Sequence, residues 1–73
     1  MDPYEKLANA IILQAVKDYR DALKKLVRGR KNTSAEDTKR ECERFFRSQW
    51  YSALTSVDGE MLIRKLNEEV TDL

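Results

Sequence analysis

Residues 3–28 read PYEKLANAIILQAVKDYRDALKKLVR, and this stretch decides the fold. Its apolar residues recur at intervals of three and four positions, which places them along one face of an α-helix. Asp2 and Pro3 are typical of a helix N-cap and of the first helical position, and Gly29 is well placed to end the helix. A helix over residues 3–28 would be ~39 Å long. It therefore needs packing partners along its whole length, from the rest of the chain or from a second copy.

A second helix is predicted to begin at Thr33 or Ser34. The residues TSAE at positions 33–36 have the form of a capping box, in which the Glu36 side chain reaches back to the Thr33 amide. Helical spacing of apolar residues continues to residue 54. Ser48 could instead begin a fresh turn, so a kink near residues 47–49 is the alternative to one continuous helix.

A third helix is predicted to follow a break at residues 55–59. Ser56 is its expected N-cap, and Gly59 falls in its first turn, where glycine has two explanations: tolerance near a helix end, or close approach of another backbone or a ligand. We therefore expect an all-α fold, a three-helix antiparallel hairpin or bundle with a long N-terminal helix. Residues 1–73 are expected to form a single helical domain that is completed by oligomerisation.

The composition limits how such a short chain can be stabilised. A domain of 73 residues buries only roughly 60% of the surface that its unfolded chain exposes, so its stability alone is marginal. There is no His and a single Cys, Cys42, which excludes a zinc site and a disulfide within the chain. Self-association is the remaining support, and we expect neither a metal nor a cofactor.

Charge and hydropathy exclude further classes of protein. The net charge of +1 excludes a strongly basic nucleic-acid binder. Residues 24–31 nevertheless hold five basic and no acidic side chains, which is explained either by a helix C-terminus that favours cations or by a surface that binds an anion or a partner. The longest apolar run, residues 10–13, is too short to cross a membrane. With no signal-peptide pattern and one lone Cys, the cytoplasm is the expected compartment.

The residues needed for most catalytic sites are missing from the sequence. Without His there is neither a Ser-His-Asp nor a Cys-His arrangement, and there is no glycine-rich phosphate loop. Cys42 lies at a core position of the second predicted helix, where a free cysteine packs as a small apolar residue. The sequence therefore predicts a protein that is not an enzyme.

Residues 41–51, ECERFFRSQWY, hold four of the six aromatic side chains and two arginines. Because the aromatic residues form two adjacent pairs, one member of each pair must face away from the core. We expect Phe46 and Trp50 to face inward, and Tyr51 and Arg47 to lie near the surface one helical turn apart. Such a pair suits a base or a phosphate, a protein–protein hot spot, or simply an aromatic core.

These observations define two sets of candidate residues. Arg47 is the first candidate for contact with an anionic ligand. The ligand-binding candidates are Arg47, Tyr51, Lys24, Lys25, Arg28, Arg30 and Lys31. The candidates for an oligomer or partner interface are Tyr4, Ile11, Ile12, Tyr19 and Trp50.

Three stretches carry a resemblance to a known group: ILQAVKDYR at 12–20, ERFFRSQWY at 43–51 and DGEMLIRKL at 58–66. Their patterns, A-V-x-D-Y-R, F-F-R-S-x-W-[YF] and D-G-x-x-L-I, resemble a family of small all-helical proteins of Firmicutes phages and prophages. The resemblance implies a phage or mobile-element origin and the cytoplasm of an infected or lysogenic bacterium. Small phage proteins of this size are often DNA-associated regulators or antagonists of host defence, and some are helical oligomers that sequester cyclic nucleotide signals.

Three functions follow as expectations. The first is a non-enzymatic, phage-type accessory protein that antagonises host defence by sequestering a cyclic nucleotide or another anionic small molecule as a homo-oligomer. The alternative is a protein-binding inhibitor, like an anti-CRISPR protein, that acts on a host defence protein. The second alternative is a DNA-binding accessory or regulatory protein, which is weakened because the third predicted helix offers only Arg64, Lys65 and Asn67 for contacts with bases.

Overall fold

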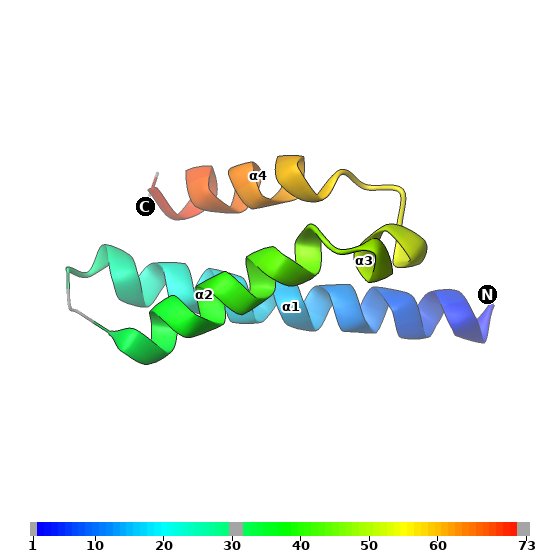
Figure 1. Cartoon of the computed structure of the whole chain (residues 1–73), viewed down its shortest axis with the longest axis horizontal. Helices are drawn as coiled ribbons and strands as arrows, with labels where there is room; N and C mark the ends of the chain where they lie inside the picture. Colours follow the sequence, from blue (N-terminus) through cyan, green and yellow to red (C-terminus); the bar gives the residue numbers. More distant parts are fainter. Residues whose placement is uncertain (1, 30–31, 72–73) are drawn as a thin grey trace.

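The computed structural model describes residues 2–29 and 32–71, and this part of the chain is all-α, as predicted. Its helices are α1 (Pro3–Val27), α2 (Thr33–Phe46), α3 (Gln49–Leu54) and α4 (Gly59–Thr71). Figure 1 shows α2 folding back along α1, the short α3 lying near the N-terminal half of α1, and α4 returning along the bundle. The long α1 gives the molecule its elongated envelope of 42 × 23 × 19 Å.

Helix α1 begins and ends where the sequence predicts, to within one residue. The Asp2 carboxylate accepts a hydrogen bond from the backbone N–H of Tyr4 at 3.0 Å, with Pro3 at the first helical position. At the other end, Gly29 has a φ of +78° and donates its N–H to the carbonyl of Leu26 at 3.2 Å. Glycine adopts this left-handed conformation without steric penalty, which is why the helix stops there.

Helix α2 is capped by Asn32, and the predicted capping box at Thr33 is wrong. The Asn32 side-chain oxygen accepts from the N–H of Ala35 at 3.0 Å, and its carbonyl accepts from the N–H of Glu36 at 3.0 Å. Asn32 has the extended backbone of an N-cap, whereas Thr33 is already helical. The physical reason is that the side-chain carbonyl of Asn reaches the third N–H of the helix as well as a hydroxyl does.

The second predicted helix divides at Ser48, so the described chain has four helices rather than three. The Ser48 hydroxyl donates to the carbonyl of Phe45 at 2.6 Å and accepts from the N–H of Tyr51 at 3.1 Å. The same oxygen thus closes the end of α2 and caps the start of α3. The alternative start that the sequence left open at Ser48 is the one observed.

Helix α4 is capped by Asp58, not by Ser56 as predicted. The Asp58 carboxylate accepts from the N–H of Glu60 at 3.0 Å. Gly59, the first residue of α4, lies against the end of α2: a Cβ atom added there would be 2.0 Å from the carbonyl oxygen of Phe46. Glycine is therefore required by close approach of two backbones rather than merely tolerated near a helix end.

The core lies where α1, α2, α3 and α4 meet. Tyr19, Phe46 and Tyr51 are its largest buried side chains, and their rings meet edge to face, with centroids 5.7 Å apart for Tyr19 and Phe46 and 5.8 Å apart for Phe46 and Tyr51. Such pairs stabilise a core beyond the area they bury. The core residues are Tyr19, Leu23, Cys42, Phe46, Tyr51, Ile63, Leu66 and Val70.

The prediction that Trp50 is buried is wrong. Trp50 is 59% exposed, whereas its neighbour Tyr51 is buried. The expected arrangement assumed that one helical stripe runs from Phe46 to Trp50. The break at Ser48 starts a new helix with a new axis, so the count of about 100° per residue does not carry across it.

Candidate functional site

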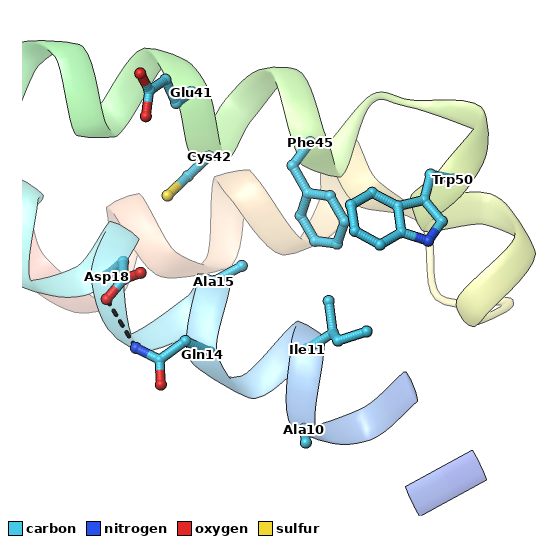
Figure 2. Close-up of a pocket in the computed structure, with 9 residues that line it drawn as sticks. All are labelled: Ala10, Ile11, Gln14, Ala15, Asp18, Glu41, Cys42, Phe45 and Trp50. Carbon is cyan, nitrogen blue, oxygen red and sulfur yellow. Dashed lines mark hydrogen bonds between the residues drawn. The ribbon is translucent and has the colours of Figure 1, made fainter. Parts of the chain in front are cut away.

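An apolar groove is the first candidate binding surface. It is a hollow of about 530 Å³ between α1, α2 and α3. In Figure 2, Phe45 and Trp50 lie side by side and face Ile11 across the groove, and their ring centroids are 5.4 Å apart. The groove is lined by Ala10, Ile11, Gln14, Ala15, Asp18, Glu41, Cys42, Phe45 and Trp50.

One end of the groove is polar. The Gln14 amide donates to the Asp18 carboxylate at 3.0 Å, and Glu41 lies opposite on α2. Between them lies Cys42, whose pKa is raised by burial and by the charges of Asp18 and Glu41. The thiol therefore stays protonated near neutral pH and contributes packing rather than a nucleophile.

The exposed apolar surface continues beyond the groove along the N-terminal half of α1. Tyr4 is 71% exposed and Leu7 is 61% exposed. With Ile11 they recur at intervals of three and four residues, which places the three side chains on one side of the helix. Exposed apolar side chains that are contiguous in this way are typical of interaction surfaces.

Three arginines form the second candidate surface, the arginine cluster Arg40, Arg44 and Arg47. Together with Glu43 and Ser48 they line a hollow of about 480 Å³ on the far side of α2. Arg40 is 3.9 Å from Asp37, a loose contact between exposed side chains. Within residues 2–29 and 32–71, Arg44 makes no ion pair.

Arg47 is held by Glu60 at the start of α4. Its Nε donates to one Glu60 oxygen, and its second guanidinium nitrogen lies 3.5 Å from the other. This hydrogen bond and the charge of Glu60 raise the pKa of Arg47 above its ordinary value. Both side chains are more than half exposed to solvent.

The structure does not bring Arg47 and Tyr51 together as an exposed platform. Tyr51 is buried among the core aromatic rings, and burial followed by the charge of Asp58 raises its pKa. The prediction that Tyr51 lies at the surface is therefore wrong. The reason is the break at Ser48, which starts a new helix axis and also leaves Trp50 exposed.

The basic segment at the end of α1 is divided between two sides of the helix. Lys24 and Arg28 border a small hollow against the end of α4. Lys25 lies instead beside Asp18 and Asp21, on the side of α2. Lys24 and Lys25 occupy the last turn of α1, where cations favour the helix dipole. Two further candidates lie outside the described residues: Arg30 and Lys31.

Among the interface candidates, Tyr19 is fully buried within the chain and belongs to the core. Its hydroxyl donates to the Glu43 carboxylate at 2.7 Å and accepts from the Asn67 amide at 2.9 Å. Burial and the bond to Glu43 raise the pKa of Tyr19 to about 12. Ile12 is half-buried against the core.

Glu43 also accepts from the Lys39 ammonium, at 2.9 Å. Burial alone would raise the pKa of Glu43, but the hydrogen bonds from Lys39 and Tyr19 outweigh it and hold the pKa below its ordinary value. Glu43 is thus a charged member of a structural network that joins α1, α2 and α4. Its negative charge is offset by Lys39, although it borders the arginine cluster.

Sequence reasoning missed several residues of both surfaces. Arg40 and Arg44 stand seven and three positions before Arg47, so helical spacing alone could have grouped them. No such signal existed for Phe45 or Asp18 as groove residues, because α1, α2 and α3 form the groove only after they pack.

Comparisons with known proteins add no relative: no family model matches the chain, and neither the curated proteins nor the solved structures contain a match. In the described part of the chain, no helix is long and apolar enough to cross a membrane. Nor do residues 2–29 and 32–71 bring together three or more His, Cys, Asp or Glu side chains that could hold a metal ion.

Proposed function

We propose that this protein is a non-enzymatic, phage-type accessory protein that binds a small anionic, nucleotide-like ligand as a homo-oligomer and thereby withholds a signal from host defence. The observation that carries the proposal is the arginine cluster, in which three guanidinium groups border one hollow on α2. The resemblance to small phage proteins supports the assignment to host defence.

The spacing of the arginine cluster suits a ligand with more than one phosphate. Arg40, Arg44 and Arg47 stand at intervals of four and three residues, which puts neighbouring Cβ atoms about 5–6 Å apart on one side of a helix. A guanidinium group offers paired N–H donors that match two phosphate oxygens. A cyclic dinucleotide or a diphosphate can therefore engage two arginines at once, whereas a monophosphate engages fewer.

Phosphate can compete for these arginines because their existing partners are weak. The ion pairs of Arg47 with Glu60 and of Arg40 with Asp37 join exposed side chains, and exposed ion pairs add little to stability. An incoming phosphate would replace a carboxylate without exposing any buried charge. Arg44 is exposed and makes no ion pair with another described residue, so it is the first side chain available to a ligand.

The same features disfavour the DNA-binding alternative. The net charge of the chain is +1, and residues 51–73 hold five acidic against two basic side chains. Affinity for DNA rests mainly on the number of phosphates neutralised, and the arginine cluster offers three cations beside the carboxylate of Glu43. A compact anion fits this surface better than a duplex.

The test is calorimetry of the purified protein against a nucleoside, its 5′-monophosphate, its 5′-diphosphate and a cyclic dinucleotide. We expect affinity to rise with the number of phosphates and to fall with added salt. Arg44→Ala should weaken binding about tenfold or more, because a hydrogen bond to a charged group contributes ~1.5–3 kcal/mol. Arg44→Lys should fall between Arg44→Ala and the wild type, since it keeps the charge and loses the paired donors.

Arg64→Ala is the matched control, because Arg64 is an exposed arginine on α4 that lies outside the arginine cluster. Its affinity should equal that of the wild type. The proposal fails if the wild type gives no heat with any compound of the panel, or if Arg44→Ala binds as tightly as Arg64→Ala does.

A further inference from the structure

We propose that the apolar groove is the interface between two copies of this chain, in which the N-terminal halves of α1 pack antiparallel about a two-fold axis near Ile11. The proposal rests on the homo-oligomer of the proposed function and specifies its contact surface. It concerns the side of the molecule formed by α1, Phe45 and Trp50, not the arginine cluster.

The first argument is that α1 is covered along only part of its length. Its largest buried side chains, Tyr19 and Leu23, lie in the C-terminal half, and the single buried residue of the N-terminal half is Ala8. Tyr4 and Leu7 remain mostly exposed. A helix that extends beyond its own bundle with apolar residues on one side lacks a partner there.

The second argument is the area available. A buried aromatic side chain covers ~150–250 Å², so Tyr4 and Trp50, at 71% and 59% exposure, offer roughly 200–300 Å² per copy. Two copies would contribute roughly 400–650 Å² from these side chains alone, about a third of a standard interface of ~1,600 Å². The exposed parts of Leu7, Ile11 and Phe45 add to that area and bring it closer to the area that a stable dimer buries.

The third argument selects a second copy as the occupant. On α1 the residues Tyr4, Leu7, Ile11, Gln14 and Asp18 alternate at intervals of three and four, which is the spacing of a helix–helix seam. In an antiparallel pair centred on Ile11, Tyr4 faces Asp18, and Leu7 faces Ala15, which also lines the groove. The seam is therefore self-complementary, as a two-fold interface requires.

The polar end of the groove fits the same arrangement. Asp18 and Glu41 place carboxylates at one end of an otherwise apolar surface. Asp18 accepts one hydrogen bond there, from the Gln14 amide, and a carboxylate has the capacity to accept a further one from the occupant. In the antiparallel pair the Tyr4 hydroxyl of one copy reaches the Asp18 carboxylate of the other. A foreign helix would need a donor placed at the same distance from its apolar residues, whereas the second copy already carries one.

The experiment is sedimentation equilibrium of the full chain from submicromolar to high micromolar concentration, with tryptophan emission recorded across the same range. Trp50 is the only tryptophan of the chain, so its emission reports the groove directly. We expect the mass to rise from 8.6 kDa to twice that value. The emission should shift to shorter wavelength in parallel, as Trp50 becomes covered.

Two matched variants separate this interface from nonspecific association. Leu7→Glu places a charge on the seam and should abolish the dimer, whereas Leu13→Glu should leave it intact. Leu13 is a leucine of the same helix with a similar exposure of 66%, but it lies about 120° around the helix axis from Leu7, at ~100° per residue. Both residues are exposed, so neither substitution removes a core contact.

A cysteine variant tests the antiparallel geometry. In a Cys42→Ala background, Ile11→Cys should form a disulfide between copies under mild oxidation, because position 11 faces itself across the axis. Tyr4→Cys should not form this disulfide, since position 4 of the other copy lies near the opposite end of the seam. Efficient cross-linking through position 4 would mean parallel helices and would overturn the arrangement.

The remaining outcomes also decide the proposal. A protein that stays monomeric at all concentrations overturns the proposed dimer interface. If the Trp50 emission of such a monomer shifted on adding a nucleotide, the groove would be a ligand pocket instead. Equal effects of Leu7→Glu and Leu13→Glu overturn the interface as well. A dimer that binds no nucleotide refutes only the ligand of the proposed function. A monomer that binds nucleotide through Arg44 refutes the interface and the homo-oligomer, and leaves the ligand of the proposed function standing.

Discussion

Replacing Gly59 by alanine should separate the ends of α2 and α4. The added Cβ atom would lie 2.0 Å from the Phe46 carbonyl oxygen and 2.9 Å from its carbon. Carbon and oxygen atoms without a covalent bond rarely approach closer than ~3.3 Å, so one helix must move by roughly 1.3 Å. The atom in the way belongs to the backbone of a buried residue and cannot turn aside as a side chain would.

The magnitude follows from two opposing effects. Forcing extra volume into a packed region costs about 1–3 kcal/mol and occasionally more, and the rigid obstacle places Gly59→Ala at the upper end. Alanine recovers about 0.5–1 kcal/mol because it loses less backbone freedom than glycine in a helix. The net loss of unfolding free energy is about 2–3 kcal/mol, which lowers the Tm by about 10–20 °C in a domain of this size.

Urea and thermal unfolding followed by circular dichroism would measure this loss, at one fixed protein concentration because association shifts the apparent stability. Gly29→Ala is the matched control. A Cβ atom there meets no described atom within 4 Å, so only the strain of the positive φ remains, about 1–2 kcal/mol. If Gly59→Ala were as stable as the wild type, or lost less stability than Gly29→Ala, the close approach of α2 and α4 would be refuted.

Two tyrosines yield further predictions. Folded Tyr19 has a pKa of about 12, whereas an unfolded tyrosine has a pKa of about 10. The contribution of Tyr19 to the free energy of unfolding is therefore complete below pH ~10 and falls by about 2–3 kcal/mol as the pH rises towards ~12. Urea unfolding between these pH values should show Tyr19→Phe less stable near neutrality but without this part of the alkaline decline; parallel declines would contradict the raised pKa. Tyr51→Phe should keep or gain up to about 1 kcal/mol, since the buried Tyr51 hydroxyl has no partner among the described residues, and a clear loss in the same assay would reveal a hydrogen bond to that hydroxyl.

The candidate surfaces were only partly predictable. The sequence predicts Arg47 as a ligand-binding candidate, and Arg47 belongs to the arginine cluster, but its pairing with Glu60 depends on how α4 approaches the end of α2. Trp50 was named as an interface residue and also expected to be buried, and the structure leaves it exposed. The groove could not be predicted, because its walls come from three helices whose relative placement no local pattern encodes.

The sequence by itself determined the class of fold and the ends of α1. Asp2 and Gly29 act through hydrogen bonds to neighbours within four residues, and Pro3 acts through its own fixed φ. Their effect can therefore be read without knowing the tertiary structure. Only the tertiary structure decides whether Trp50 or Tyr51 faces the core, and only the tertiary structure explains why position 59 must be glycine. The break at Ser48 resets the helical phase, so which ring is buried depends on where α3 packs. The need for Gly59 depends on the Phe46 carbonyl, thirteen residues away in the chain and in contact only after folding.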